Sequence, residues 1–466
     1  MNFKHGINPN QEFIFPKKPS DFLPDDHLAK AIHEIMKLLD FSKIEVKYSE
    51  VGQNAYAPRM MTSLLFYGYS TSVRSSRKIS KGCGERFDFV YLAEGLKPSH
   101  DRISDFRKEN LEELKALFQE IVLIGNLMGL AKFGNIKTSI DGSKVRANAS
   151  SKLSKDEEGL NKLLEKTKEE IDKMFEEAEQ IDKEEDEKYG KENRGDELPE
   201  KLRSKESREK AIKEAIKKLK ERKEEMKNRI KEEKNREPTE SELKKIDKMK
   251  INITDNDAKF MKEREGTIKP NYNAQISVDE EEQFIIANDV VDECNDQHQL
   301  VSMLNQTKEN IGESPKQAKA DNGYFPQLEE ATKLFPEIDL YVDDKNRRKE
   351  YINFHELKQK YSKEEYSNLL KIVSPEGEKE YKKRMHTVEP PFGNLKHNLG
   401  YRSFLLRGLS KVKGEFNLMC IAHNLKKMVS FITKKKMTLA KALTNIKEEM
   451  KEITKVRRSN GFRVGC

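Results

Sequence analysis

The sequence has few of the residues that mark secreted, zinc-binding or membrane-spanning proteins. Four of its 466 residues are cysteines and none is tryptophan. The four cysteines are scattered, without a CxxC pair, which argues against a disulfide framework and against structural zinc. No apolar run approaches the roughly 20 residues of a membrane span, and the first residues lack a signal-peptide pattern. We therefore expect a protein of the reducing cytoplasm that makes no membrane contact.

Basic and acidic residues are nearly balanced along most of the chain, and a clear excess of one sign occurs only near the C-terminus. The chain has 89 basic and 82 acidic residues, a net charge of +7. Residues 151–250 hold 30 Lys and Arg against 31 Asp and Glu, whereas residues 391–466 hold 17 against 4, a net charge of +13. A basic terminal segment suggests a polyanion such as nucleic acid as partner. The alternative is a solvated basic tail.

The first 130 residues have the periodicity of helices. Apolar residues recur at helical spacing from Leu28 to Leu39, Pro58 suits a first helical turn, and residues 111–130 form an apolar helix pattern. Either a helix-turn-helix or a plain helical packing domain agrees with this segment. The basic residues that a helix-turn-helix would present are Arg74, Arg77, Lys78, Arg102 and Arg107.

Alternating patterns after residue 130 predict a mixed sheet. Strands are expected at 136–141, 272–278, 284–291, 318–320 and 338–342. Asn295 and Asp296 are suited to cap a helix over about 297–311. Strands joined by helices in this order indicate an α+β or α/β domain.

A highly charged segment interrupts this pattern at residues 152–250. Its apolar residues lie three to four apart in two runs, separated by the breaker-rich stretch YGKENRGDELP. We predict a long helical hairpin, coiled-coil-like; solvated or partly disordered helices are the alternative. The predicted domains are 1–130 (helical, DNA-binding), 131–151 plus 251–436 (catalytic), 152–250 (insertion) and 437–466 (basic tail).

Three acids are singled out by their positions. Asp141 ends the first predicted strand, Asp321 follows the strand after the crossover helix, and Glu389 precedes a long amphipathic region. Carboxylates at the ends of adjacent strands are suited to hold two Mg²⁺ ions that activate water or a 3′-hydroxyl. The alternative is that the two aspartates are turn residues and the glutamate a surface residue.

The segment YKKRMHTVEPPFGNLKHNLGYRSFLLRG (381–408) closely resembles the Tyr-Arg-Glu-Lys signature of bacterial insertion-sequence transposases with a DDE catalytic core. Tyr381, Arg384, Glu389 and Lys396 fill its four places. Four residues separate Arg384 from Glu389, one more than in the usual pattern. The segments TSIDGSKVRAN and ADNGYF look like the two Asp motifs of the same family.

This resemblance implies a ribonuclease H-like sheet with flanking helices, in which Asp141, Asp321 and Glu389 bind two Mg²⁺ ions, with Mn²⁺ as a substitute. It implies cleavage of double-stranded DNA at the element's terminal inverted repeats and strand transfer into target DNA, by a homodimer located at the nucleoid. Residues expected to contact DNA are Tyr381, Arg384, Lys396, Arg402 and Arg407. The alternatives are a nuclease of the same fold without strand transfer, and a catalytically inactive DNA-binding or assembly protein.

Overall fold

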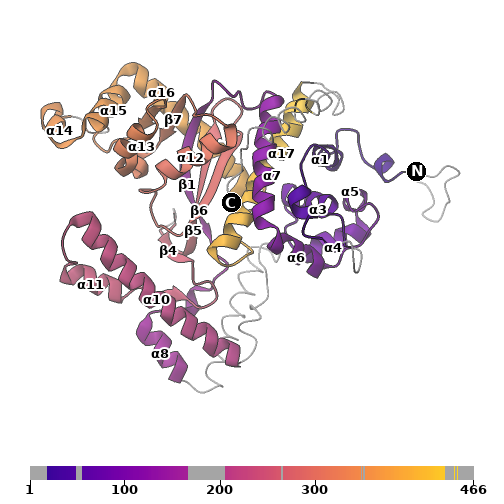
Figure 1. The fold of residues 1–466 in the computed structure, drawn as a ribbon, viewed down its shortest axis with the longest axis horizontal. Coiled ribbons are helices and arrows are strands. Elements are labelled where there is room, and N and C mark those ends of the chain that lie inside the picture. The colour runs from indigo at the N-terminus through magenta and orange to yellow at the C-terminus, as the bar shows by residue number, and fades with distance from the viewer. Residues whose placement is uncertain are drawn as a thin grey trace, which may run out of the picture.

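A mixed β-sheet lies at the centre of the molecule, with helices on both faces (Figure 1). The structure is a computed structural model that describes residues 18–48, 55–165, 205–263, 266–347, 349, 352–435, 446 and 449. The predicted basic tail at 437–466 therefore lies almost wholly outside the described residues. No helix in the described ranges is long and apolar enough to cross a membrane.

The N-terminal part is helical, as the periodicity predicts. A hydrophobic cluster joins these helices to the sheet across residue 130, because α7 packs along the C-terminal helix α17 (Leu409–Lys434). Figure 1 shows these two helices side by side, between the sheet and the other N-terminal helices. The N-terminal helices are α1 (Leu28–Met36), α2 (Ser42–Glu45), α3 (Pro58–Ser70), α4 (Ser76–Glu85), α5 (Phe87–Leu92), α6 (His100–Glu109) and α7 (Leu111–Leu127), preceded by the 3₁₀ turn η1 (Pro19–Phe22).

The sheet has the order β4-β5-β1-β7-β8, with β6 pairing to β5 as well. β5 runs antiparallel to β1, whereas β7 is parallel to β1 and β8 is parallel to β7. This is the ribonuclease H-like mixed sheet with flanking helices that the resemblance implies. The strands are β1 (Lys137–Arg146), β4 (Lys259–Lys262), β5 (Ile268–Asp279), β6 (Ile285–Val291), β7 (Gln317–Ala320) and β8 (Asp339–Val342).

The two faces of the sheet are covered by different helices. Ile140 of β1 packs in the cluster under α12 (Leu300–Ile311) and α13 (Leu328–Leu334), with the 3₁₀ segment η5 (Asn322–Gln327) before α13. Its neighbour Asp141 points to the opposite face, which is covered by α16 (Pro375–Gly393). Side chains alternate between the two faces along a strand. Ile140 therefore packs in the hydrophobic core, and the next residue, Asp141, faces the candidate site.

Asparagine side chains cover the backbone of β8 and of β6 at the outside of the sheet. Asn368, on α15 (Lys363–Val373), accepts from the amide of Val342 at 3.1 Å and donates to its carbonyl at 2.7 Å. Asn424 of α17 makes the same pair of bonds with Ile285, at 2.9 and 2.8 Å. An amide side chain thus takes the place of a further strand at each point, which blocks edge-to-edge pairing. The short α14 (Phe354–Lys360) precedes α15.

The charged insertion is closed at its base by a two-stranded ladder. β2 (Ser154–Lys155) pairs antiparallel with β3 (Ile251–Asn252), just after the short turn η2 (Ser151–Leu153). Between them, α8 (Glu157–Glu165) packs on α10 (Lys205–Lys234), and α11 (Glu240–Asp247) follows. The rest of the predicted first arm and its turn lie outside the described residues.

Ion pairs hold α10 of the insertion against the loops beside the sheet. Lys218 Nζ lies 2.5 Å from Asp257 Oδ1, and Arg222 Nη2 lies 3.6 Å from Asp292 Oδ2. Arg229 Nη1 lies 3.2 Å from Glu293 Oε1. The charged face of α10 is therefore in contact with the loops before β4 and after β6, while α8 packs on the same helix.

A buried carboxylate ties the N-terminal helices to the segment that follows the Glu389 region. Glu415, on α17, accepts the amides of Leu405 and Leu406 at 2.8–3.0 Å and lies 3.3 Å from Arg74 Nη1. The Glu415 and Arg74 side chains are 0% and 1% exposed. Arg74 also donates to the carbonyl of Ser403 and stacks over the ring of Tyr401.

Replacing Glu415 by Gln should destabilise the protein strongly. The substitution leaves the Arg74 guanidinium buried without its counter-charge and removes one acceptor oxygen from the amides, at a cost of about 3–5 kcal/mol. Urea unfolding followed by circular dichroism measures the loss. The control is Glu240→Gln in an exposed pair with Lys244, expected to cost under about 1 kcal/mol. Equal unfolding midpoints for both variants would contradict the assignment.

A buried histidine joins the end of α16 to α17 and to the β5–β6 turn. His423 Nδ1 lies 3.0 Å from Asn394 Nδ2, and His423 Nε2 lies 3.0 Å from the carbonyl of Gln283. Asn394 Oδ1 is occupied by a bond from Asn398, so the amide presents its NH₂ to the ring. The ring is thus neutral, with Nε2–H donating, and burial lowers the pKa of His423 to about 4.

The pKa of His423 predicts a specific acid sensitivity. Its folded value of about 4 is below the unfolded value of about 6.5, so the unfolded state binds the proton first. The stability that it contributes is complete above pH 6.5 and falls by up to roughly 3 kcal/mol as the pH drops toward 4. Melting temperatures of the wild type and His423→Gln across pH 4–8 measure this. Parallel curves would refute the assignment.

Candidate active site

Asp141 and Asp321 lie together where two parallel strands meet. Asp141 is the fifth of the ten residues of β1, so the expectation that it ends its strand was wrong, because β1 continues to Arg146. Asp321 directly follows β7, which pairs with β1 from Lys137 to Ser139. Arg384 of α16 reaches both carboxylates. Its Nη2 is 2.6 Å from Asp141 Oδ1 and 3.6 Å from Asp321 Oδ2. The sheet therefore brings together two acids that are 180 residues apart in the sequence.

Burial makes this pair electrostatically unusual. It raises the pKa of Asp141 to about 6; Arg384 opposes the rise, and Asp321 and Asp296 add to it. Burial also raises the pKa of Asp321, again opposed by Arg384 and increased by Asp296. Carboxylates that repel each other in a partly desolvated site are stabilised by a cation placed among them.

Glu389 lies on the same helix as Arg384 but faces another direction. Five residues on an α-helix correspond to a rotation of about 140°, so the two side chains cannot share a face. Val388, four residues after Arg384, is buried, whereas Glu389 is exposed. The additional residue between Arg384 and Glu389 therefore turns the carboxylate toward solvent. Directly after Glu389 come Pro390 and Pro391, and α16 continues into the π-turn η6 (Asn394–Asn398).

Lys396 and Tyr381 have partners inside the protein. Lys396, in the π-turn, donates to Ser143 Oγ at 2.7 Å and to the carbonyl of Lys144 at 2.6 Å, which places it beside β1 just past Asp141. Tyr381 is buried on α16, and the guanidinium of Arg347 lies 4.8 Å from its ring centroid. The structure thus places Arg384 and Lys396 against the strand of Asp141, with Tyr381 packed in the helix interface.

The segment after the π-turn runs beside the end of β1. The amide of Arg146 donates to the carbonyl of Arg402, and the amide of Phe404 donates to the carbonyl of Arg146. The Arg402 side chain is exposed. Arg407 instead donates through Nε to the carbonyl of Asn148 at 2.8 Å and through Nη2 to its side-chain oxygen at 3.0 Å.

A third aspartate close to the pair was not identified by sequence reasoning. The sequence suggested Asn295 and Asp296 as a helix cap, but α12 begins at Leu300 with Gln299 as its N-cap. The side chain of Asp296 instead accepts from Asn273 Nδ2 at 2.7 Å and from Gln275 Nε2 at 2.6 Å. A capping prediction uses local spacing only, so it could not detect strand β5 beside this loop.

Two of the basic residues considered for a helix-turn-helix are interior. Arg74 and Arg107 are buried, and Arg107 donates to the hydroxyl of Tyr69 and to the carbonyl of Arg74. They hold the helices together rather than presenting charge to a ligand, which corrects that expectation. Arg77 and Arg102 are exposed.

The chemistry of the donor set fits a magnesium-like cation. Asp141 and Asp321 offer only oxygen ligands, which Mg²⁺ and Mn²⁺ prefer. Among the residues that the structure describes, no group of three or more His, Cys, Asp or Glu side chains is placed to hold a metal ion. The structure thus places Asp141 and Asp321 beside Arg384, and Glu389 faces solvent.

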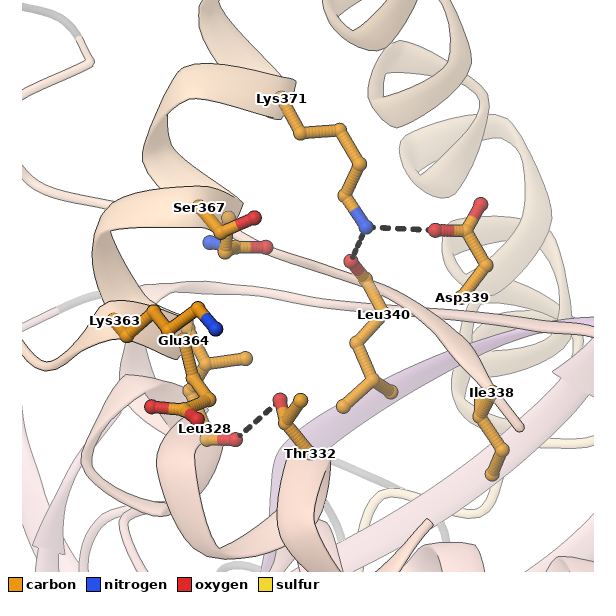
Figure 2. A pocket seen from close by; sticks show the side chains of 10 residues that line it. Leu328, Thr332, Ile338, Asp339, Leu340, Lys363, Glu364, Ser367 and Lys371 are labelled. Carbon is orange, nitrogen blue, oxygen red and sulfur yellow. Dashed lines mark hydrogen bonds and ion pairs between the residues drawn. The ribbon is translucent and has the colours of Figure 1, made fainter. Parts of the chain in front are cut away.

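A separate cavity of about 210 Å³ lies at the far edge of the sheet, between α13, β8 and α15. Figure 2 shows Lys371 bridging Asp339, 2.7 Å from its Nζ, and the carbonyl of Leu340 at this cavity. Asp339 begins β8, whereas Asp321 follows the end of the neighbouring parallel strand β7. The cavity is therefore at the opposite end of the strands from the candidate site.

Two family models match the chain, one in its N-terminal part and one in its C-terminal part. Residues 17–109 match the Transposase domain (DUF772), and residues 344–429 match the Transposase DDE domain. No curated protein and no solved structure matches the chain. The first match covers the helical N-terminal part, and the second contains α16, Arg384 and Glu389. Both matched models are transposase domains, so over these two regions the chain is similar to transposases, which supports an insertion-sequence transposase.

Proposed function

We propose that this transposase cuts DNA at the ends of its element and joins the freed ends to target DNA, with Asp141 and Asp321 at the reacting phosphate. The observation that carries the proposal is the arrangement of these two partly buried carboxylates around Arg384, one in β1 and the other directly after the neighbouring strand β7. The helix that supplies Arg384 belongs to the region that matches the DDE domain.

Asp141 and Asp321 would hold the divalent cations. Such ions lower the pKa of an attacking water or hydroxyl and stabilise the charge on the leaving oxygen. In the metal-free protein, Arg384 balances the two carboxylates and keeps them oriented. We assign Glu389 as the third acid, which is exposed on α16 and joins the site when DNA is bound.

The chemistry is two phosphoryl transfers. In the first, a water oxygen bonds to phosphorus as the bond to the 3′-oxygen breaks, leaving a 5′-phosphate and a 3′-hydroxyl. In the second, this hydroxyl bonds to a phosphorus of target DNA as the target's own 3′-oxygen leaves, so one phosphodiester replaces another. Positioning and charge stabilisation supply most of the rate enhancement in such reactions.

The side chains that we propose as DNA contacts differ in the intramolecular contacts that each would lose on binding DNA. Arg402 is exposed beside the end of β1 and can bind a phosphate directly. Lys396 and Arg407 would exchange bonds to Ser143 and Asn148 for bonds to DNA. Tyr381 is buried, so it supports α16 and would reach a base only after that helix moves. We further propose a homodimer that bridges two element ends.

Asp141→Asn should abolish strand cleavage while the protein stays folded. We expect an initial nicking rate lower by about 1,000-fold or more, because several kcal/mol of transition-state charge stabilisation is lost. A plasmid carrying the inverted repeats that flank the gene, incubated with full-length protein and Mg²⁺, measures nicked and joined products. The control is Asp247→Asn, at an exposed site on α11. Equal cleavage by the two variants would overturn the proposal.

Glu389→Gln should separate DNA cleavage from metal binding by the free protein. Since Glu389 faces solvent in the free protein, we expect its variant to bind Mn²⁺ as the wild type does but to nick DNA about 100-fold more slowly or worse. Asp141→Asn should lose both. Wild-type cleavage by Glu389→Gln would remove Glu389 from the catalytic set and leave the two aspartates.

A further inference from the structure

A lysine of β7 is buried on the face of the sheet that α16 covers. Ala318 and Ala320 pack in the cluster under α12 and α13. Because side chains alternate along a strand, Lys319 between them points to the opposite face, as Asp321 does two residues later. The Lys319 side chain is 0% exposed. A charge that is buried so completely needs counter-charges and hydrogen-bond acceptors around it.

Two carboxylates and an amide surround the ammonium group of Lys319. It donates to Gln317 Oε1 at 2.6 Å, to Glu380 Oε1 on α16 at 3.0 Å, and to Glu280 in the turn between β5 and β6. Glu380 Oε1 also lies 3.6 Å from Lys137 Nζ on β1. Burial opposes the ionisation of Glu380, but the neighbouring lysines outweigh it and lower the pKa of this carboxyl to about 2. A charged glutamate of α16 is thus bound by lysines of two adjacent strands.

The contacts of Glu380 and Arg384 form two successive layers between α16 and the sheet. These two residues are four apart on the helix, a rise of about 6 Å. Lys319 and Asp321 are two apart along the strand direction, about 6.6 Å, so the spacings match. In the first layer the helix supplies the acid and the strands supply lysines, and in the second the helix supplies the cation and the strands the acids. A slide of α16 by one turn would bring like charges together, which disfavours any other register.

We infer that Lys319 and Glu380 are positioning residues for the candidate site: their ion pair sets the rotation and register of α16, and so keeps Arg384 against the two aspartates. This assignment rests on the proposed function for the reaction that the placement serves, but the placement itself can be measured without DNA. With α16 fixed as far as Arg384, a movement that turns Glu389 toward the site is confined to the part of the helix that follows.

Glu380→Ala removes the helix side of the ion pair without leaving Lys319 unpaired. Because Lys319 keeps Glu280 and Gln317, we expect a melting temperature close to that of the wild type. With full-length protein, Mg²⁺ and a supercoiled plasmid carrying the inverted repeats, kcat for nicking should fall about 10- to 100-fold while KM for DNA stays unchanged. Glu380→Gln keeps an acceptor oxygen at the same side-chain length and should recover most of the rate.

Hydrogen exchange of the DNA-free protein, followed by mass spectrometry, gives a readout that does not depend on cleavage. Peptides from residues 381–393 should exchange faster in Glu380→Ala and at the wild-type rate in Glu380→Gln, since only the first loses the local anchor. The matched control for both measurements is Glu378→Ala on the same helix. Its side chain pairs with Lys382 and is 46% exposed, so we expect wild-type nicking and wild-type exchange.

The results that would overturn the assignment differ from those that would contradict the proposed function. Wild-type exchange across α16 in Glu380→Ala overturns the assignment, as does a wild-type nicking rate. A Glu380→Gln variant as slow as Glu380→Ala also overturns it, and so does faster exchange throughout the protein with a lower melting temperature, which would indicate a general structural role. A wild type that cuts no end-containing DNA contradicts the proposed function alone, because exchange still measures the placement of α16.

Discussion

The bonds of the Glu415 carboxylate are the constraint on which the rest of the molecule depends. Glu415 accepts two consecutive amides from the segment after the π-turn and lies against Arg74 of the N-terminal helices, with both side chains buried. A buried pair is costly to desolvate, and once formed it is costly to break. Three separate parts of the sequence are thereby fixed to each other: the α3–α4 connection, residues 401–406 and helix α17.

This arrangement also determines what α16 presents to the sheet. The helix is held at its end by Asn394 and His423, and along its length by Arg384 on Asp141. With those contacts made, Val388 faces the interior and Glu389 faces solvent. Helix α16 thus directs the guanidinium of Arg384 toward the sheet and the carboxylate of Glu389 toward solvent. Bringing the acid inward requires α16 to rotate or to change its register near Pro390 and Pro391, where the chain cannot form normal helical hydrogen bonds.

Sequence patterns predicted the framework of the fold well. The alternation around Asp141 and at 272–278 located β1 and β5, and the family resemblance indicated how the strands are ordered. The expected end of the first strand at Asp141 was wrong, since β1 continues to Arg146, but the parallel pairing of β1 with β7 still brings Asp141 close to Asp321. These features depend on local periodicity and on a small set of topologies, both of which a single sequence contains.

Side-chain direction and long-range pairing were not predictable in the same way. The buried state of Arg74 and the position of Asp296 beside Asn273 depend on partners far away in the sequence. The orientation of Glu389 was implicit in the additional residue after Arg384, but only the helix geometry shows its consequence. A polar residue in a loop has no periodicity to reveal its role, so Asp296 resembled an ordinary cap.

The ladder between β2 and β3 has a consequence for how this chain varies. By joining residues 154–155 to 251–252, it brings both ends of the insertion together at a fixed point outside the main sheet. The entropy of closing a loop grows only slowly with its length once its ends are joined. A change in the length of the insertion beyond this ladder would therefore cost little closure entropy, because the ladder keeps the two ends of the insertion paired.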